Sequence, residues 1–132
     1  MNSKDRTMKT ILIVEDNAKN MKLVRDLLQH HGHRTLEAET GEAAFALAHR
    51  ERPDLVLMDI QLPDVDGATV LARIREDASF DAMPVLAVSA SVMPDEQQRV
   101  VRSGFDGFIA KPISIKPFLA AVQRALTEGR AK

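Results

Sequence analysis

The sequence predicts an α/β protein whose doubly wound parallel sheet of five strands carries five helices on its two faces. Two observations lead to this prediction. Short apolar runs alternate along the whole chain with segments whose apolar residues recur at helical spacing. Most of these runs are apolar throughout, which is typical of strands buried on both faces of a parallel sheet. Strands that alternate with helices in this way are joined by right-handed crossovers.

The five strands are expected at short segments bounded by polar or turn-forming residues. The central one, residues 55–58, is an apolar run that ends abruptly in Asp59. Pro63 and Gly67 suit the turn that leads from it into a helix. The other strands are predicted at residues 10–14, at the weaker segment 34–38, at 84–90 and at 108–110.

The helices after the first three strands have recognisable ends. Asn17 and Thr40 are typical N-cap residues, and the third helix begins near Gly67. Gly32 is placed to end the first helix in a left-handed conformation. Residues 77–83 are expected to form a loop. Apolar residues spaced three and four apart mark the buried faces of these helices: Met21, Val24, Leu27, Leu28, Ala44, Leu47, Ala48, Val70, Leu71 and Ile74.

The last two helices differ in their apolar anchors. Pro94 fits the first turn of a helix expected to run to Gly104, and its few apolar residues predict that it is the least firmly held. Ser114 is expected to cap the last helix, and Pro117 is tolerated in its first turn. The buried stripe of that helix is predicted at Ile115, Leu119, Val122 and Leu126.

Composition narrows the class of protein. The 132 residues fit one domain, which we expect to span residues 9–128 between a flexible leader (1–8) and a polar tail (129–132), with no output domain. The formal net charge of -1 gives no electrostatic reason to expect a nucleic-acid partner. There is no cysteine, and no apolar segment is long enough to span a membrane. A cytoplasmic location is therefore expected.

Chemically distinctive side chains follow four of the predicted strands. Glu15 and Asp16 follow the first, Asp59 the third, Ser89 ends the fourth and Lys111 follows the fifth. The carboxyl ends of parallel strands share one edge of the sheet, so these side chains should converge there. Three neighbouring carboxylates repel one another unless one is protonated or a cation lies among them. Oxygen ligands completed by water suit Mg²⁺.

A carboxylate flanked by a divalent cation and an ammonium can attack phosphorus. Mg²⁺ and Lys111 would neutralise charge on the transferring phosphoryl oxygens, and the product would be an aspartyl phosphate at Asp59. Ser89 could then donate a hydrogen bond to a phosphoryl oxygen. Taken singly, a turn-capping Asp, a strand-end hydroxyl and a surface Lys are the simpler interpretations. Together these three residues favour a catalytic constellation.

This set of residues resembles a response-regulator receiver domain of the CheY-like kind. The resemblance implies a flavodoxin-like fold with strand order 2-1-3-4-5. It also implies that Mg²⁺ is bound by Asp16, Asp59 and the backbone carbonyl of Gln61, with Glu15 acting through water. The matching elements are Glu15, Asp16, Asp59, Pro63, Gly67, Ser89, Ala90, Lys111 and Pro112.

The resemblance further implies a conformational switch. A cis peptide bond before Pro112 would aim Lys111 into the site. On phosphorylation, the Ser89 hydroxyl is drawn inward and the aromatic residue on the fifth strand follows it. That residue is Phe108 here, where Tyr is frequent; without a hydroxyl, its preference between two rotamers should be weaker.

The implied function is that of a phosphoacceptor in a two-component phosphorelay. Asp59 would receive its phosphoryl group from a histidine kinase or a histidine phosphotransfer protein. The domain would assist only its own phosphorylation and dephosphorylation, and would signal to a target protein through its fourth helix, fifth strand and fifth helix. Residues 14–23 and 58–63 look most like the DivK type, stand-alone receivers that set cell polarity and division timing in α-proteobacteria.

Several alternatives share this architecture. A receiver-like module that binds partners without phosphorylation remains open. A small Mg²⁺-dependent phosphatase with an aspartyl-phosphate intermediate is disfavoured, because Gln61 stands where haloacid-dehalogenase-type enzymes carry a second Asp. Glu15 and Asp16 would repel the flavin phosphate of a flavodoxin.

Three histidines lie close together in the sequence: His30, His31 and His33. They suggest a metal cluster, but a solvated helix terminus is the interpretation that we favour.

Overall fold

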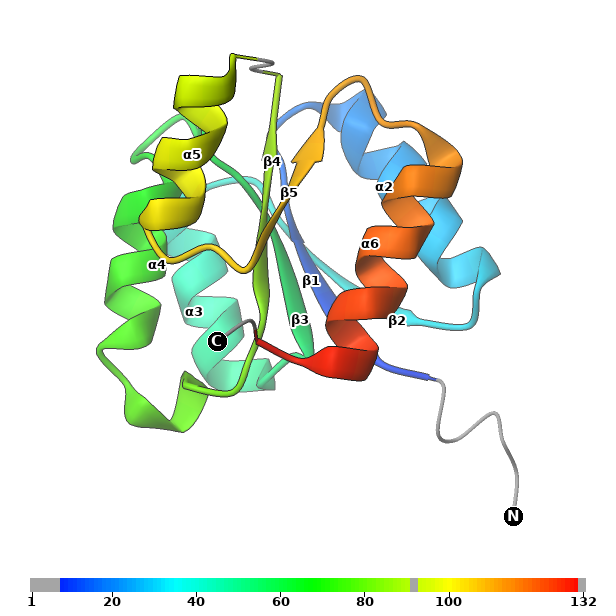
Figure 1. Cartoon of the computed structure of the whole chain (residues 1–132). Coiled ribbons are helices and arrows are strands. Elements are labelled where there is room, and N and C mark those ends of the chain that lie inside the picture. The colour runs from blue at the N-terminus through cyan, green and yellow to red at the C-terminus, as the bar shows by residue number, and fades with distance from the viewer. Residues whose placement is uncertain (1–7, 91–92, 131–132) are drawn as a thin grey trace.

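The computed structural model describes residues 8–90 and 93–130, and the structural findings below concern those residues. They form one sheet of five parallel strands in the order β2-β1-β3-β4-β5, as Figure 1 shows. This arrangement confirms the predicted fold. The strands are β1 (Thr10–Val14), β2 (Arg34–Ala38), β3 (Leu55–Asp59), β4 (Val85–Ser89) and β5 (Gly107–Ala110).

Within residues 8–90 and 93–130, five α-helices cover the two faces of this sheet. One face is covered by α3, α4 and α5, and the other by α2 and α6 (Figure 1). Right-handed crossovers that change direction at β1 produce this doubly wound arrangement. The helices are α2 (Ala18–His30), α3 (Gly41–Glu51), α4 (Gly67–Arg75), α5 (Pro94–Arg102) and α6 (Ile115–Glu128).

The sheet is buried on both sides, because β1, β3 and β4 are apolar at every position except one end: Thr10 in β1, Asp59 in β3 and Ser89 in β4. In β1, Leu12 faces the α3, α4 and α5 side, whereas Ile11 and Ile13 face α2 and α6. Neighbouring β3 alternates in the same way, and all five of its residues are buried. Each large apolar side chain buried here contributes about 1.5–3 kcal/mol to stability. The carboxyl ends of β1 and β3 are therefore held at a rigid edge.

The predicted caps are largely confirmed. The Asn17 side chain accepts a hydrogen bond from the backbone N–H of Asn20, and Thr40 does the same for Ala43. Gly32 has a φ of 85°, the left-handed conformation expected after α2. Ser114 occupies the N-cap position of α6 but makes no side-chain capping bond. Local sequence thus placed the helix starts correctly, while a capping bond depends on the side-chain rotamer.

Two details differ from the predictions, and a third agrees with them. The segment expected to be a loop contains a short 3₁₀ helix, η1 (Ala78–Phe80), capped by the Asp77 side chain. Helix α5 ends at Arg102, before Gly104, whose φ of 110° is incompatible with an α-helix. Of the residues in α5, only Val100 is buried, in agreement with the few apolar anchors predicted for it.

The buried face of α6 was partly misassigned. Ile115 is 53% exposed, so the prediction that it belongs to the buried stripe is wrong. Phe118, Val122 and Ala125 form the buried face, and Leu119 flanks it at the edge. Ile115 stands at the first position of the helix, where the chain has not yet turned onto the sheet.

A buried ion-pair network lies near the starts of β4 and β5, at the end of the sheet opposite Glu15, Asp16 and Asp59. The Asp106 carboxylate, with only 4% of its side chain exposed, pairs with Arg75 at 3.1 Å and with Arg130 at 3.1 Å. It also accepts a hydrogen bond from the Val85 backbone N–H. The network ties the start of β4, the start of β5, α4 and the segment after α6 together.

None of the helices formed by residues 8–90 and 93–130 is long and apolar enough to cross a membrane. Residues 1–7 of the predicted leader and residues 131–132 of the predicted tail lie outside the described part of the chain.

Candidate phosphoacceptor site

Asp59 ends β3 and is held in a fixed orientation. Its residue is only 4% exposed. One carboxylate oxygen, Oδ1, accepts a hydrogen bond of 2.9 Å from the Gln61 backbone N–H, and the other, Oδ2, accepts one of 2.9 Å from the Lys111 ammonium. Both oxygens are thus oriented by donors on different elements. The carboxylate is preorganised rather than free to rotate.

The turn after β3 depends on Gly67. A Cβ atom at this position would lie 2.8 Å from the Asp59 backbone oxygen and 2.9 Å from the Cα of Ile60. The Gly67 N–H donates to the Ile60 carbonyl at 3.0 Å, and the Asp66 side chain caps α4 through the Thr69 N–H. Only glycine allows the chain to fold back so closely on the strand that carries Asp59.

Lys111 bridges two of the carboxylates. Its ammonium lies 2.9 Å from Oε1 of Glu15 and 2.9 Å from Oδ2 of Asp59. Burial alone lowers the pKa of Lys111, but the hydrogen bonds to Glu15 and Asp59 outweigh burial and raise its pKa above the ordinary value. The group therefore remains a full positive charge at the floor of the site. The backbone N–H of Lys111 donates to the Ser89 carbonyl at 2.8 Å, and the peptide bond to Pro112 is cis, as the family resemblance implies.

The three acids expected at this edge are brought together. Carboxylate oxygens of Glu15, Asp16 and Asp59 all lie within 4.8 Å of one another. Glu15 is buried, and this burial is the main cause of its raised pKa; the neighbouring Asp59 charge adds to the increase, while Lys111 and the Asn17 backbone N–H oppose it. Asp16 is exposed and faces solvent. The cluster is open on one side and closed by Lys111 on the other.

This donor set fits a divalent cation. Three carboxylates share one ammonium among the described residues that contact them, so negative charge is in excess. Hard oxygen donors beside a solvent-exposed position suit Mg²⁺, which keeps several of its waters. That Asp16 and Asp59 hold the ion directly and Glu15 holds it through water stays a prediction. The role of the Gln61 carbonyl stays a prediction, although its N–H already fixes this loop on Asp59.

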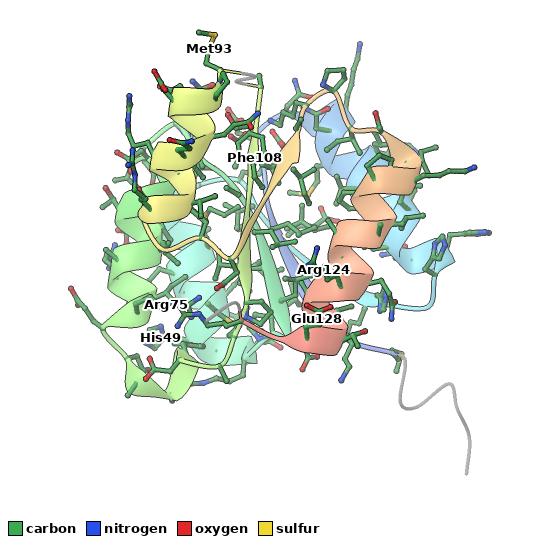
Figure 2. All side chains as sticks on the ribbon, in the orientation of Figure 1. His49, Arg75, Met93, Phe108, Arg124 and Glu128 are labelled. Carbon is green, nitrogen blue, oxygen red and sulfur yellow. The ribbon has the colours of Figure 1, made fainter. Side chains whose placement is uncertain are left out.

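The predicted switch residues lie on β4, on β5 and in the segment that follows β5. Ser89 is 4% exposed at the end of β4 and is paired in register with Ala110 of β5. Phe108 is half-buried on β5 and packs at the border of the apolar cluster under α5, where Figure 2 shows it below Met93. Pro112 is exposed. Their participation in a switch stays a prediction.

Sequence reasoning missed the backbone donors of the site. The N–H groups of Asn17 and Gln61 bond the carboxylates of Glu15 and Asp59 at 3.1 and 2.9 Å. In both cases the donor is the backbone N–H of the residue two positions after the acid. This contact depends on the loop conformation, and every residue except proline has such an N–H group. The sequence therefore carries almost no signal for it. The sequence analysis predicted that Lys111 lies beside Asp59, but it did not predict the second contact of Lys111, to Glu15.

The fold and the site together define a signalling phosphoacceptor: a doubly wound sheet with a buried, oriented aspartate beside an acidic pair and a lysine. The model of the response regulator receiver domain matches residues 11–123. The chain belongs to this family.

Relatives and solved structures agree with this assignment. The chain is 42% identical over 118 residues to the polar-differentiation response regulator DivK of Brucella anthropi, covering 89% of this chain and 96% of that protein. The Brucella ovis DivK is 41% identical with the same coverage. The structure is similar to the chemotaxis response regulator CheY4 of Vibrio cholerae, with a TM-score of 0.84, 26% identity and coverage of 89% and 98%.

A further solved structure bears on the metal. The receiver domain of the sensor histidine kinase PA1611 from Pseudomonas aeruginosa superposes with a TM-score of 0.83 at 28% identity, covering 90% of this chain and 98% of that one. That structure has a magnesium ion coordinated in its active-site cleft.

Proposed function

We propose that this protein is a response regulator in a phosphorelay and that Asp59 accepts its phosphoryl group from a phosphohistidine. The donor is a histidine kinase or a histidine phosphotransfer protein. The observation that carries the proposal is the Asp59 carboxylate, buried and held at 2.9 Å by the Lys111 ammonium beside two further acids.

The chemistry is a transfer between two nucleophiles. A carboxylate oxygen of Asp59 attacks phosphorus, a P–O bond forms, the P–N bond of the donor breaks, and the histidine nitrogen leaves with the electron pair and takes up a proton. Lys111 stabilises the negative charge that gathers on the phosphoryl oxygens. Mg²⁺ held by the acidic cluster would supply further charge neutralisation to the transferring phosphoryl group. Ser89 would donate a hydrogen bond to a phosphoryl oxygen once Asp59 is phosphorylated.

The output is proposed to be a protein contact on the surface formed by α5, β5 and α6. Large apolar side chains stand exposed there, with Met93 62%, Val101 50% and Ile115 53% exposed. A cavity of about 500 Å³ between α5 and β5 is lined in part by Val101 and Phe108. Phe108 lies on β5, the strand that precedes Lys111, and it borders this surface (Figure 2).

The finer role proposed is that of a DivK-type regulator of cell polarity and division timing in the cytoplasm. Its support is the 42% identity to a polar-differentiation regulator over 96% of that protein's length. That the protein works as a single domain, with no output domain, stays a prediction. So does the expectation that nucleic acid is not its partner.

Intact-mass analysis after incubation with a phosphorylated histidine kinase or phosphotransfer protein and Mg²⁺ tests the proposal. Wild type should gain one phosphoryl group, and Asp59→Asn should gain none, because an amide is not a nucleophile here. Acetyl phosphate is a simpler first donor. Failure of wild type with acetyl phosphate and with a panel of phosphorylated donors would favour the phosphate-independent binding module. Labelling of Asp59→Asn would overturn the assignment of Asp59.

Steady release of inorganic phosphate from an outside phosphate ester would instead favour a phosphatase. The exposed Gln61 offers no acid to protonate a leaving group. We therefore expect no such turnover beyond loss of the protein's own phosphoryl group.

A further inference from the structure

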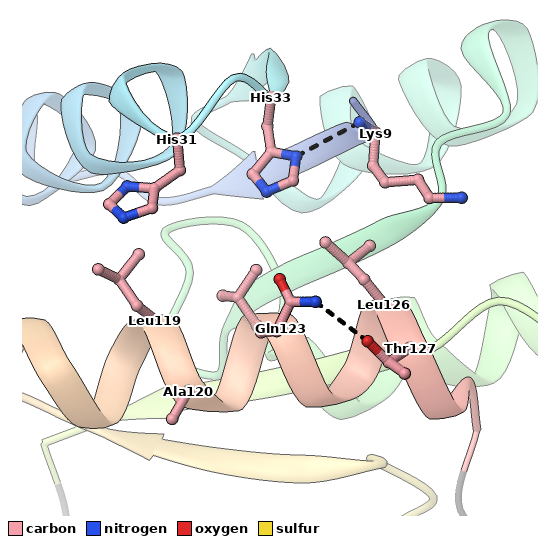
Figure 3. Close-up of a pocket in the computed structure, with 9 residues that line it drawn as sticks. Lys9, His31, His33, Leu119, Ala120, Gln123, Leu126 and Thr127 are labelled. Atoms are coloured by element: carbon pink, nitrogen blue, oxygen red, sulfur yellow. Dashed lines mark hydrogen bonds between the residues drawn. The ribbon is translucent and has the colours of Figure 1, made fainter. Parts of the chain in front are cut away.

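A cleft of about 750 Å³ opens at the edge of the sheet opposite Asp59. Figure 3 shows it between two walls: the segment where β1 and β2 begin, and the C-terminal half of α6. Its volume lies within the roughly 300–1,000 Å³ typical of small-molecule sites. It shares no lining residue with the phosphoacceptor site.

One wall of the cleft is basic. Lys9, His31 and His33 line it, and they come from the start of β1 and the turn between α2 and β2. The two rings are held by the backbone: Nδ1 of His33 accepts from the Lys9 N–H at 3.3 Å, and Nδ1 of His31 donates to the Leu27 carbonyl at 3.0 Å. Each ring keeps its Nε2 atom available to another partner.

The opposite wall is apolar with a polar rim. Leu119, Val122 and Leu126 of α6 form it, at the three- and four-residue spacing of one helix face. Gln123 and Thr127 stand beside them and are joined by a hydrogen bond of 3.1 Å (Figure 3). The cleft thus pairs a hydrogen-bonding, cationic side with a surface suited to an aliphatic chain or ring.

In the described part of the chain, the lining of the cleft supplies no negative charge opposite the basic wall. None of the nine described residues that line it is acidic. Burial is the main cause of the lowered pKa of His33, and the positive charges of His31 and Lys9 lower it further. At the C-terminal end of α2, the Leu28 carbonyl already accepts the backbone N–H groups of His31 and His33, each at 3.1 Å.

We propose that this cleft binds a small amphipathic organic anion, namely a carboxylate or a phosphate ester that carries an apolar chain or ring. The anionic group would lie against Lys9 and His33, and the apolar body against Leu119 and Leu126. The proposal is independent of phosphorylation at Asp59.

A titration of the ¹⁵N-labelled full chain with octanoate, followed by NMR, tests the proposal. Octanoate should shift the amide signals of Lys9, His33, Gln123 and Thr127 in a saturable manner. Acetate, which lacks the apolar body, and 1-octanol, which lacks the charge, should each shift them far less. Equal shifts with 1-octanol and octanoate, or octanoate shifts spread over the whole surface, would overturn the proposal.

Variants then locate the anion. Lys9→Gln and His33→Gln should each weaken octanoate binding about tenfold, the scale of one lost charge-assisted contact. Gln123→Glu, an isosteric change at an exposed position, should abolish binding by adding a negative charge to the rim. The matched controls Lys19→Gln and His30→Gln alter exposed residues outside the cleft and should bind as wild type does.

Octyl phosphate distinguishes the two classes of anion. Tighter binding than octanoate assigns a phosphate ester, and weaker binding assigns a carboxylate. Absence of binding by both, or unchanged binding in Lys9→Gln, His33→Gln and Gln123→Glu, would overturn the proposal.

Discussion

The ammonium of Lys111 lies 2.9 Å from Oδ2 of Asp59, although 52 residues separate them in the chain. The same ammonium lies 2.9 Å from Glu15. In the described part of the molecule, it is the positive charge that contacts the acidic cluster. Both the stability of the site and its affinity for cations should therefore depend on this one side chain.

Removing that charge should destabilise the protein. Lys111→Met keeps most of the aliphatic stem but leaves Glu15 and Asp59 buried without their partner. We expect the free energy of unfolding, measured by urea denaturation in a chelator, to fall by about 2–3 kcal/mol, somewhat below the usual cost of breaking a fully buried pair because the Lys111 side chain is 17% exposed.

Two comparisons make this measurement specific. Lys116→Met, at an exposed lysine of α6, should change stability little. Adding Mg²⁺ should reduce the loss in Lys111→Met, because the metal replaces part of the missing positive charge. A Lys111→Met protein as stable as wild type in chelator would show that the bridge contributes nothing.

Metal binding should stabilise the wild type. Three carboxylates within 4.8 Å repel one another, and an ion bound only by the folded state raises stability by about 2.7 kcal/mol at 100 times its dissociation constant. Thermal melts should therefore show Tm rising by several degrees as Mg²⁺ replaces chelator. Asp16→Asn should lose most of this shift, whereas Asp95→Asn, at an exposed acid of α5, should keep it. An undiminished shift in Asp16→Asn would place the metal elsewhere.

The free energy of unfolding should depend on pH through the titration of His33. Its pKa in the folded protein is lowered from 6.5, first by burial and then by His31 and Lys9. Between that lowered pKa and 6.5 the unfolded chain binds more protons than the folded protein, so the free energy of unfolding rises with pH through this window. The contribution of neutral His33 is fully present above pH 6.5 and is lost as the pH falls.

Urea denaturation across mildly acidic pH measures this effect. His33→Gln should show a smaller loss of stability below pH 6.5 than wild type, while the exposed His30→Gln should follow the wild-type curve. Parallel curves for wild type and His33→Gln would mean that His33 does not titrate differently on folding.

Local sequence patterns were enough to predict the helices, the strands and the functional side chains at the strand ends. Apolar runs defined the strands, Asn17 and Thr40 began two helices, and Asp59 was placed at the end of a central strand. These features depend on spacing and propensity within a few residues, so they can be recognised without long-range contacts. The wrong prediction for Ile115 shows the limit of this approach. Helical spacing of apolar residues does not reveal at which residue a helix first packs against the sheet.

Contacts between side chains that are distant in the sequence became known only from the folded structure. The second contact of Lys111 to Glu15, the pairing of Asp106 with Arg75 and Arg130, and the cleft lined by His33 were not predicted. Each joins segments whose separation is set by strand register, crossover direction and side-chain rotamers. A charged residue carries no local signal for its partner, because the energy that selects the partner arises only once the sheet has assembled and excluded water.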